Sequence, residues 1–461
     1  MSNLKVFKMI QLVLACMVCT SITAQLKSLS LKDALILAEK NYPQIKAKQL
    51  QVSSAKANIL ASQMDYLPNI KLHAQIDNAT ANSLAGTYFP YGVVVPISGA
   101  INNTSDPKSY FGSIGLAYLE LPLYGFGQIR AKVNISKASY ATELGAYENE
   151  KFNMYIRICI SYLDFLSYHQ LKIVQEKNLE RALTLQKSII ANVRNGLKPG
   201  VDSSFAAAEI SNAKLQLFEL EKKENEQKNI LANSIGILNN EFNPDTMSFS
   251  NALLKLDTIH SVINHPLVRY FESRIKESQA KEHYIALNYL PKFSLLGADW
   301  GRGSGLSPIS KSENSTSFNE GTNLTRFNYA IGIACTFTIS DIPKNILLKR
   351  VEHLKIASEK ENLNGIKQEL KNEQQLADDN LVLSLKQANE APNQLKAGTD
   401  NYNQKLTMYN NGLASIVDLA QALYNLNRAE TAQTIYINAA WKALLFKAES
   451  IGDLSIFTKQ F

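Results

Sequence analysis

The sequence predicts a mostly α-helical protein that consists of two tandem repeats, each with two β-strands and one long α-helical hairpin. Three observations lead to this fold class. Two long segments of the first half recur in the second half, which indicates an internal duplication. Each half contains stretches that alternate between apolar and polar residues, as strands do. Each half also contains a long helical stretch that is broken once by an Asn-Gly turn.

The duplication is clearest in two pairs of segments. Residues 195–238 align without gaps on residues 411–454, and both copies begin with Asn-Gly-Leu and carry an Ile-Gly pair near their end. Residues 41–72 align in the same way on residues 264–295, and both copies have an Asn-x-Pro motif followed later by Tyr-Leu-Pro. Chance similarity between helical segments would not preserve a turn together with a distant Ile-Gly pair. We therefore divide the chain into two repeats.

The resulting organisation has five parts. They are a signal peptide over residues 1–24, a first repeat over 25–240, a connecting segment over 241–263, a second repeat over 264–455 and a tail over 456–461. The elements expected in the first repeat are strands at about 67–78 and 109–122 and a helical hairpin at about 128–238. The elements expected in the second repeat are strands at about 290–300 and 325–340 and a hairpin at about 343–452.

Each repeat opens with a helix, over residues 30–65 or about 264–289, which ends at Tyr-Leu-Pro because the residue before a proline favours extended backbone. Strands follow the proline. Residues 327–339 place aromatic and aliphatic side chains on one face and small or polar side chains on the other. The loops between the two strands of a repeat, about 79–108 and 302–324, are rich in Asn, Ser, Gly and Pro, as exposed loops are.

The helical arms are too long for a compact domain. Residues 123–198 contain no proline. If most of residues 128–194 is helical, this arm is about 100 Å long at 1.5 Å per residue. Gly196 and Gly200 then reverse the chain into a second helix, and Asp202 lies in its first turn, where a carboxylate suits the free amides. The two Asn-Gly turns are therefore the predicted tips of two helical hairpins.

The start of the chain predicts export. Residues 1–24 combine a basic start, an apolar run and small residues, which is typical of a secretory signal peptide. Lipidation at Cys16 is an alternative, because the residues that end at this cysteine loosely resemble a lipoprotein box. After cleavage the remaining cysteines are Cys159, in a helical pattern, and Cys335, in a strand-like pattern. We therefore expect no disulfide framework.

Composition narrows the possible classes further. A formal charge of +7 is small and dispersed, and gives no support to nucleic-acid binding. After the signal peptide no run of about 20 apolar residues remains, so we expect no membrane-spanning helix. An exported chain of this kind is either soluble or enters a membrane as a β-barrel.

Four strands cannot close a membrane barrel, since the smallest such barrels have about eight. Several copies of the chain would have to contribute to one barrel. A soluble β-sandwich is the alternative, and strand alternation alone favours it. The predicted export, the lack of a disulfide framework and the long hairpins favour the membrane barrel instead.

Over about residues 28–455 the sequence resembles the TolC-like outer-membrane efflux protein family. The motifs are LSLKDALILAEKNYPQIKAKQ near the start, Tyr-Leu-Pro in both repeats, LPLYGFGQIRAKV before the first long helix and YNNGLASIVDLAQALYNLNRAE late in the chain. The resemblance implies a homotrimer in which each chain gives four strands to one 12-stranded barrel. It also implies that an α-helical tunnel projects into the periplasm of a Gram-negative bacterium.

The implied function is that of the outer-membrane channel of a tripartite efflux system, a conduit from periplasm to exterior. The implied partners are a periplasmic membrane-fusion adaptor, an inner-membrane pump of the resistance-nodulation-division or ABC type, and outer-membrane lipid. A type I protein-secretion channel is an alternative with the same architecture. A soluble periplasmic coiled-coil adaptor is a further alternative, but adaptors carry one hairpin whereas this chain carries two strand-and-hairpin repeats.

The residues themselves predict no enzyme. The six histidines show no metal-ligand spacing, and neither a glycine-rich phosphate loop nor a Gly-x-Ser-x-Gly motif occurs. We therefore expect no catalytic residues, no cofactor, no metal site and no nucleic-acid partner.

The resemblance further implies a periplasmic aperture that is closed by tyrosine, arginine and aspartate contacts near the hairpin tips. Matched position by position, the tyrosine falls on Tyr409 and the aspartates of the two repeats on Asp202 and Asp418. Aspartates that ring the mouth in three chains would repel one another unless cations bind. The alternative is that both aspartates are ordinary helix-start residues.

Two positions depart from the family pattern. The arginine position is occupied by Ala414 and a further aspartate position by Gln421, so the salt-bridge lock of the family is missing. We predict a weaker latch in which Lys198 supplies a cation from the other tip. The predicted docking residues for the adaptor are those of the tip turns, namely Gly196, Leu197, Gly200, Gly412 and Leu413.

Overall fold

The computed structural model describes residues 27–82, 105–196, 198–237, 242–246, 265–307 and 311–461. The predicted signal peptide with Cys16, much of the first long loop, Leu197 and most of the connecting segment lie outside these residues. The chain forms two compact units. The helical unit comprises Met1–Val52, Thr142–Glu272 and Lys360–Phe461, and the sheet unit comprises Ser53–Ala141 and Ser273–Glu359.

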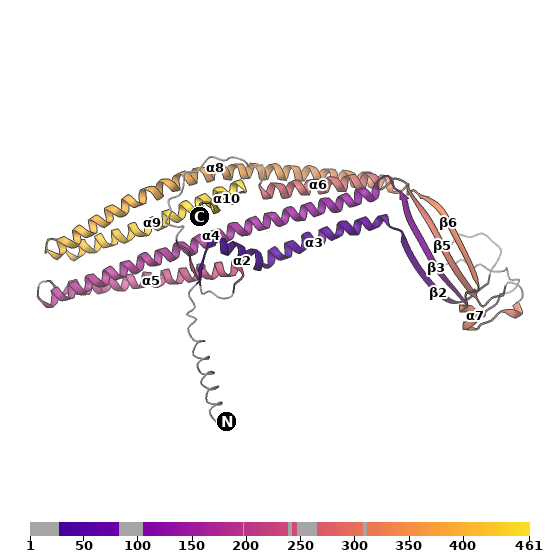
Figure 1. Cartoon of the computed structure of the whole chain (residues 1–461), viewed down its shortest axis with the longest axis horizontal. Coiled ribbons are helices and arrows are strands. Elements are labelled where there is room, and N and C mark those ends of the chain that lie inside the picture. Colours follow the sequence, from indigo (N-terminus) through magenta and orange to yellow (C-terminus); the bar gives the residue numbers. More distant parts are fainter. Residues whose placement is uncertain (1–26, 83–104, 197, 238–241, 247–264, 308–310) are drawn as a thin grey trace, which may run out of the picture. The chain divides into compact units, whose positions relative to one another are not determined.

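The sheet unit contains a four-stranded antiparallel sheet with the strand order β2-β3-β5-β6 (Figure 1). The strands are β2 (Asn69–Thr80), β3 (Ser109–Tyr124), β5 (Lys292–Ser304) and β6 (Arg326–Thr336). Each repeat supplies one antiparallel pair, and β3 and β5 join the two pairs at the centre. In the described part of the chain, the outer edges of β2 and β6 have no partner strand.

The register separates the edge strands β2 and β6 into an apolar and a more polar face, whereas the central strands β3 and β5 carry apolar residues on both faces. Ile70 lies opposite Leu119, and the next residue, Lys71, lies opposite Tyr118, so that successive pairs point to opposite sides. The apolar face carries Ile70, Leu72, Leu119, Phe327, Tyr329 and Ile331. The polar face carries Lys71, His73, Asp77, Glu120, Arg302 and Arg326. The edge strands are exposed on both faces, with Leu72 83% and Tyr329 79% exposed.

Strand β6 is shorter than the alternation pattern predicts. The pattern continues to about residue 340, but the strand ends at Thr336. The carbonyl oxygens of Thr338 and Ile339 accept hydrogen bonds from the amides of Asp341 and Ile342, at 3.1 and 3.2 Å. These turn bonds lead directly into α8 (Asp341–Asn410), and side-chain alternation alone does not reveal them.

The second long loop is partly ordered against the sheet. Strand β5 extends to Ser304, and a short helix, α7 (Phe318–Thr322), follows within the predicted loop. The ring of Phe318 meets the ring of Phe111 edge to face, with centroids 5.2 Å apart. The Ser113 hydroxyl donates to the carbonyl of Gly321 at 2.9 Å, which attaches this helix to β3.

The helices that adjoin the sheet are tied to one another by buried polar groups. They are α3 (Pro43–Gln63), α4 (Gln128–Arg194), α6 (Pro266–Leu287) and α8. The hydroxyls of Ser62 and Ser136 lie 2.6 Å apart between α3 and α4. The buried amide of Gln128 donates to the carbonyls of Leu287 and Leu290, at 2.8 and 3.1 Å. The start of α4 is thereby fixed against the end of α6.

The predicted opening helix of the first repeat is two helices. Helix α2 (Leu31–Asn41) ends before Tyr42, whose ψ of 114° is extended, and α3 begins at Pro43. A proline has no amide hydrogen and is compatible with a helix only in its first turn, so it starts α3 instead of continuing α2. By contrast, Pro392 lies inside α8, which runs past it without interruption. Its side chain is exposed.

The helical unit contains the long parts of two hairpins (Figure 1). One consists of α4 and α5 (Gly200–Ile235), and the other of α8 and α9 (Ile416–Ile451). Helices α4 and α8 have 67 and 70 residues, which corresponds to about 100 Å each. Within this unit Lys442 of α9 pairs with Asp164 of α4 at 2.5 Å.

The largest apolar core of the helical unit is built around α4 and α9. Tyr162, Phe165 and Trp441 are at most 1% exposed. Helix α10 (Ser455–Thr458) covers Trp441 with Phe457, whose ring centroid lies 6.0 Å from that of the indole. The segment predicted as a tail is therefore part of the core. Cys159 is also buried there, and burial raises the pKa of its thiol to about 12.

The repeated Ile-Gly pairs end the returning helices. Gly236 and Gly452 cap α5 and α9 with φ of 69° and 79°, a conformation that favours glycine. A Cβ atom on Gly236 would lie 2.7 Å from Cβ of Asn41, and one on Gly452 would lie 2.8 Å from Cα of His265. Both contacts are made with an Asn-x-Pro motif. The two sequence motifs of the duplication therefore pack against each other in each repeat.

None of the helices in the described part of the chain is both long and apolar enough to cross a membrane.

Candidate gate at the hairpin tips

Both hairpins turn through a glycine with left-handed backbone. Gly196 and Gly412 have φ of 74° and 77°, and their amides donate to the carbonyls of Val193 and Tyr409 at 3.0 and 3.1 Å. Because only glycine adopts this conformation without steric cost, the repeated Asn-Gly sequence has a local cause. The predicted docking residues Gly196, Gly200, Gly412 and Leu413 are all exposed. Docking of an adaptor there stays a prediction.

Two predicted gate residues meet between the hairpins. The Tyr409 hydroxyl, in the last turn of α8, donates to Oδ2 of Asp202, in the first turn of α5, at 3.2 Å. Tyr409 is 1% and Asp202 8% exposed. Burial and the neighbouring carboxylate raise the pKa of Tyr409 to about 12, so the phenol stays protonated and donates at neutral pH. This bond connects residues that are 207 positions apart.

Lys198 completes this cluster. Its Nζ lies 4.5 Å from the centroid of the Tyr409 ring, within the range of a cation–π contact. Tyr409 therefore has a cation over its ring and a carboxylate at its hydroxyl. We refer to Lys198, Asp202 and Tyr409 as the tip cluster.

Asp418 does not join the tip cluster. Its carboxylate accepts hydrogen bonds from the amide and the hydroxyl of Ser415, at 3.1 and 2.8 Å, and its own amide donates to the Ser415 hydroxyl. This is a capping box at the start of α9. The bonds from Ser415 lower the pKa of Asp418, which is exposed to solvent. In this subunit Asp418 stabilises the helix start, and a ring of aspartates at the mouth stays a prediction.

The two departures from the family pattern have local partners. Ala414 packs beside the apolar cluster that contains Tyr409. The Gln421 amide donates to Oδ1 of Asn425, one turn along α9, at 3.1 Å. Neither residue contributes a charge to the tip cluster, so Lys198 is its cation.

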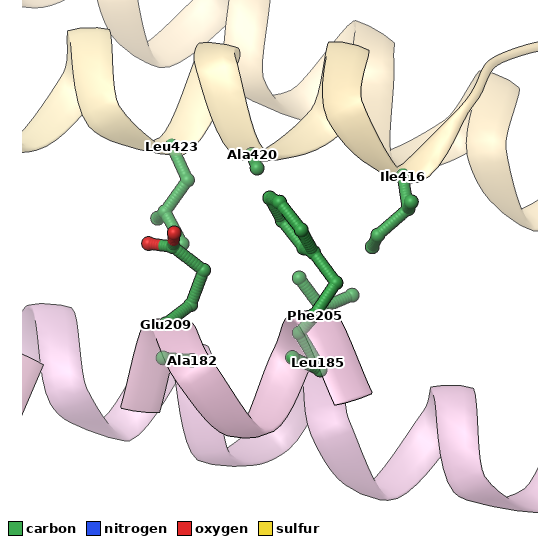
Figure 2. Close-up of a pocket in the computed structure, with 8 residues that line it drawn as sticks. Ala182, Leu185, Phe205, Glu209, Ile416, Ala420 and Leu423 are labelled. Atoms are coloured by element: carbon green, nitrogen blue, oxygen red, sulfur yellow. The ribbon is translucent and has the colours of Figure 1, made fainter. Parts of the chain in front are cut away.

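Sequence reasoning missed a contact between the hairpins behind the tip cluster. The ring of Phe205 on α5 projects towards α9 and inserts beside Ile416 and Ala420 (Figure 2). The cavity left around it measures only about 10 Å³, which is too small for a ligand. A second contact is the ion pair at 2.5 Å between Arg181 of α4 and Glu430 of α9. The sequence signal for the first contact is a single large aromatic residue among alanines, opposite a helix with small residues.

The tip cluster joins the two hairpins by one hydrogen bond and one cation–π contact, and nothing in it forms a nucleophile with an adjacent base. Among the described residues, no group of three or more His, Cys, Asp or Glu side chains could hold a metal ion. The arrangement fits a mechanical role, in which a small number of polar contacts hold two helix ends together.

Comparison with known proteins identifies the fold. Residues 34–237 match the family model of the outer membrane efflux proteins. The structure is similar to that of the outer-membrane channel OprN, with 15% identity, a TM-score of 0.73 and coverage of 92% of this chain and 89% of that one. VceC from Vibrio cholerae gives 14% identity, a TM-score of 0.68 and coverage of 92% and 96%. The Campylobacter jejuni CmeC channel gives 15% identity, a TM-score of 0.72 and coverage of 92% of this chain and 85% of that one. No curated protein sequence matches significantly.

The fold class predicted from the sequence is confirmed by these similarities, which extend over both repeats. OprN and CmeC are outer-membrane channels, and VceC is an outer membrane protein. Residues 34–237 of the chain are therefore similar to the outer membrane efflux proteins, and the chain as a whole has the fold of TolC-like outer-membrane channels.

Proposed function

We propose that this protein is the outer-membrane channel of a tripartite efflux system. Three copies form one conduit from the periplasm to the exterior, and an inner-membrane pump delivers small-molecule substrates to it through a periplasmic adaptor. The conduit exports these substrates without catalysing a reaction. The four-stranded sheet lies in the outer membrane, and the helical hairpins lie in the periplasm.

The observation that carries this proposal is the incomplete sheet. Its edge strands β2 and β6 have an apolar and a more polar face and leave apolar side chains exposed. Unpaired edges favour pairing with another strand, and four strands are too few to close a barrel. Pairing β2 of one copy with β6 of the next would close a barrel of about 12 strands from three copies. Its apolar face would then meet lipid and its polar face would line the pore.

Mass and conductance of the purified protein test this proposal. We expect the detergent-extracted protein to have the mass of a trimer and to form conducting pores in planar lipid bilayers. Substitution of β6 residues on the edge by proline, for example Ile331→Pro, should prevent assembly, because proline removes a ladder hydrogen bond. Ala330→Gly on the same strand is the matched control. A protein that stays monomeric in detergent and never conducts would contradict the proposal.

In this conduit the tip cluster is the latch of the periplasmic mouth. Support comes from its position, because Lys198 and Asp202 directly follow the turn of the first hairpin at Gly196 and Tyr409 lies in the last turn before the tip of the second. The exposed tip residues predicted to dock the adaptor lie beside it in the sequence. Adaptor binding at the tips would thus act directly on the contacts that hold the two hairpins together.

A further inference from the structure

We propose that a groove at the junction of β3 and α4 binds the phosphate-bearing head group of a membrane phospholipid. The inference rests on the proposed function, because that function puts the sheet in a bilayer and this junction at its helical end. The groove lies within the sheet unit, between the start of α4 and the end of α6, and has a volume of about 400 Å³. This size is in the range of small-molecule sites.

The walls of the groove are fixed. Gln128, in the first turn of α4, is 6% exposed and donates to two carbonyls at the end of α6. The lining side chains come from the turn before α4 and from helices α4 and α6. They are Phe126, Arg130, Ala131, Asn134, His283 and Leu287. The groove is therefore a formed feature of the junction, with apolar, cationic and amide groups in one place.

The groove is continuous with the apolar face of the sheet. A bulge at the end of β3 places Tyr124 opposite Phe293, on the same side as Leu295 and Ile333. The ring of Phe126 meets that of Tyr124 edge to face, with centroids 4.8 Å apart, and both rings are substantially exposed. Phe126 has a φ of 49°, an uncommon conformation for a bulky residue. An aromatic pair thus leads from the lipid-facing side of the sheet into the groove.

The charge in the groove is unbalanced. None of the lining residues is acidic. Two other cations of these helices are neutralised, since Lys132 pairs with Asp65 at 2.6 Å and Arg274 pairs with Glu359. Arg130, in contrast, has no ion pair or hydrogen bond to any residue that the structure describes.

These groups fit a phospholipid at a membrane surface. The planar guanidinium of Arg130 can donate two parallel hydrogen bonds to a phosphate. The imidazole of His283 and the amide of Asn134 can donate to further phosphate or glycerol oxygens. Acyl chains would then extend over Phe126 and Tyr124 along the apolar face. Aromatic residues and basic pockets at the boundary of the hydrocarbon layer are recurrent features of membrane proteins.

Native mass spectrometry of the full-length protein, delipidated in detergent, tests this site. The probes are phosphatidylglycerol, phosphatidylethanolamine and diacylglycerol, which lacks the phosphate. We expect both phospholipids to bind to each subunit and diacylglycerol to bind at least tenfold more weakly. Arg130→Gln should weaken phospholipid binding at least tenfold, and His283→Gln by a smaller factor. Arg350→Gln, which removes an exposed arginine of α8 in the same unit, should leave binding unchanged.

A second variant tests the groove independently, in case Arg130→Gln disturbs folding at the junction. Phe126→Asn removes the ring but keeps a residue that tolerates left-handed backbone, and it should also weaken phospholipid binding. The inference is overturned if Arg130→Gln binds phospholipid as the unchanged protein does, or if diacylglycerol binds equally well. It is also overturned if inorganic phosphate alone binds as tightly as the lipid, or if Arg130→Gln alters only the subunit number, which would indicate that another subunit covers the groove.

Conductance of the same preparation separates this inference from the proposed function. A protein that conducts but binds no phospholipid in the groove overturns the lipid site alone. A protein that binds phospholipid at Arg130 but neither assembles nor conducts overturns the proposed channel, and with it the assignment of the groove to a bilayer.

Discussion

The two hairpin tips come from duplicated sequence, yet they use their aspartates differently. Asp202 and Asp418 occupy equivalent positions of the two repeats. Asp418 is exposed and bonds to Ser415 within its own helix start, whereas Asp202 is buried and accepts from Tyr409 of the other hairpin. Equivalent sequence positions therefore do not have equivalent roles here.

One residue explains the difference. The position of Ser415 is taken in the first repeat by Pro199, which precedes α5 and has no side-chain capping bond. With no hydroxyl beside it, the Asp202 carboxylate is free to reach the second hairpin. The two tips also differ in their cation, because Lys198 of the first tip corresponds to the uncharged Ala414 of the second. The first tip provides the charges and the second provides the tyrosine.

The largest effect should come from Asp202→Ala. It leaves the buried Tyr409 hydroxyl without its acceptor, which costs about 1–3 kcal/mol and should favour the open mouth by a factor of roughly 5 to more than 100. Single-channel conductance in planar bilayers measures this. Asp418→Ala is the matched control and should leave conductance unchanged. A loss of block by divalent cations in both variants would support the predicted aspartate ring; an unchanged conductance and block in both would exclude that ring.

Pro199→Ser should make the first tip resemble the second. The new hydroxyl can form a capping box with Asp202, worth about 1 kcal/mol, and would draw its carboxylate away from Tyr409. We expect a higher conductance, although less than for Asp202→Ala, together with a helix start that is at least as stable.

Ser415→Ala is the counterpart of Pro199→Ser at the second tip. It should lower the free energy of unfolding by about 1 kcal/mol, as seen in chemical denaturation, without altering conductance. A closed channel with Pro199→Ser, or an open one with Ser415→Ala, would show that the capping residues do not determine which aspartate holds the latch.

A smaller effect is expected from Lys198→Gln. Removing the ammonium from the Tyr409 ring should weaken the latch by about 0.5–1 kcal/mol, and conductance should rise by a factor of about two to five. Lys198→Arg keeps the cation and should behave like the unchanged protein. Adding a cation at the family position with Ala414→Arg should reverse the effect of Lys198→Gln if the two positions serve the same latch.

The smallest effect near neutral pH is the pH dependence of stability, because Tyr409 and Asp418 titrate far from neutral pH. The pKa of Tyr409 is raised from its ordinary value near 10 to about 12. Its contribution to stability is therefore complete below about pH 10 and is lost as the pH rises towards 12. The pKa of Asp418 is lowered, so its contribution is complete above about pH 4 and is lost as the pH falls.

Thermal melting across both pH ranges measures this. The melting temperatures of the unchanged protein and Tyr409→Phe should converge above about pH 10, and those of the unchanged protein and Asp418→Asn should converge in acid. Convergence of both pairs at the same end of the pH scale would contradict the different roles of the two tips.

Local patterns were sufficient for most of the fold. Alternation located β2 and β6, and the Asn-Gly and Ile-Gly pairs located the turns and helix ends, because each depends on the backbone preferences of only a few residues. The split at Pro43 was missed even though proline signals it, since apolar periodicity continues across the break. The early end of β6 was missed because turn bonds, and not side-chain alternation, stop the strand.

The site was less accessible to sequence reasoning. Tyr409 and Asp202 were paired through the family resemblance, and Lys198 through its proximity to the tip, whereas no local pattern joins residues so far apart. The contact of Phe205 with α9 was missed, because an aromatic residue among alanines is visible in the sequence but does not specify its partner helix. For the same reason the groove with Arg130 and His283, which lie on different helices, emerges only from the structure.

The contact of a helix-ending glycine with an Asn-x-Pro segment recurs in both repeats, at Gly236 and at Gly452, whereas the contacts at the tips do not recur. In the proposed trimer these glycine contacts would accordingly show sixfold pseudosymmetry. The mouth would show only true threefold symmetry. A protein that grips the mouth would meet three equivalent places, each made of two unlike hairpins. Covalent linkage of the repeats is what permits this, since identical unlinked copies could not diverge from one another.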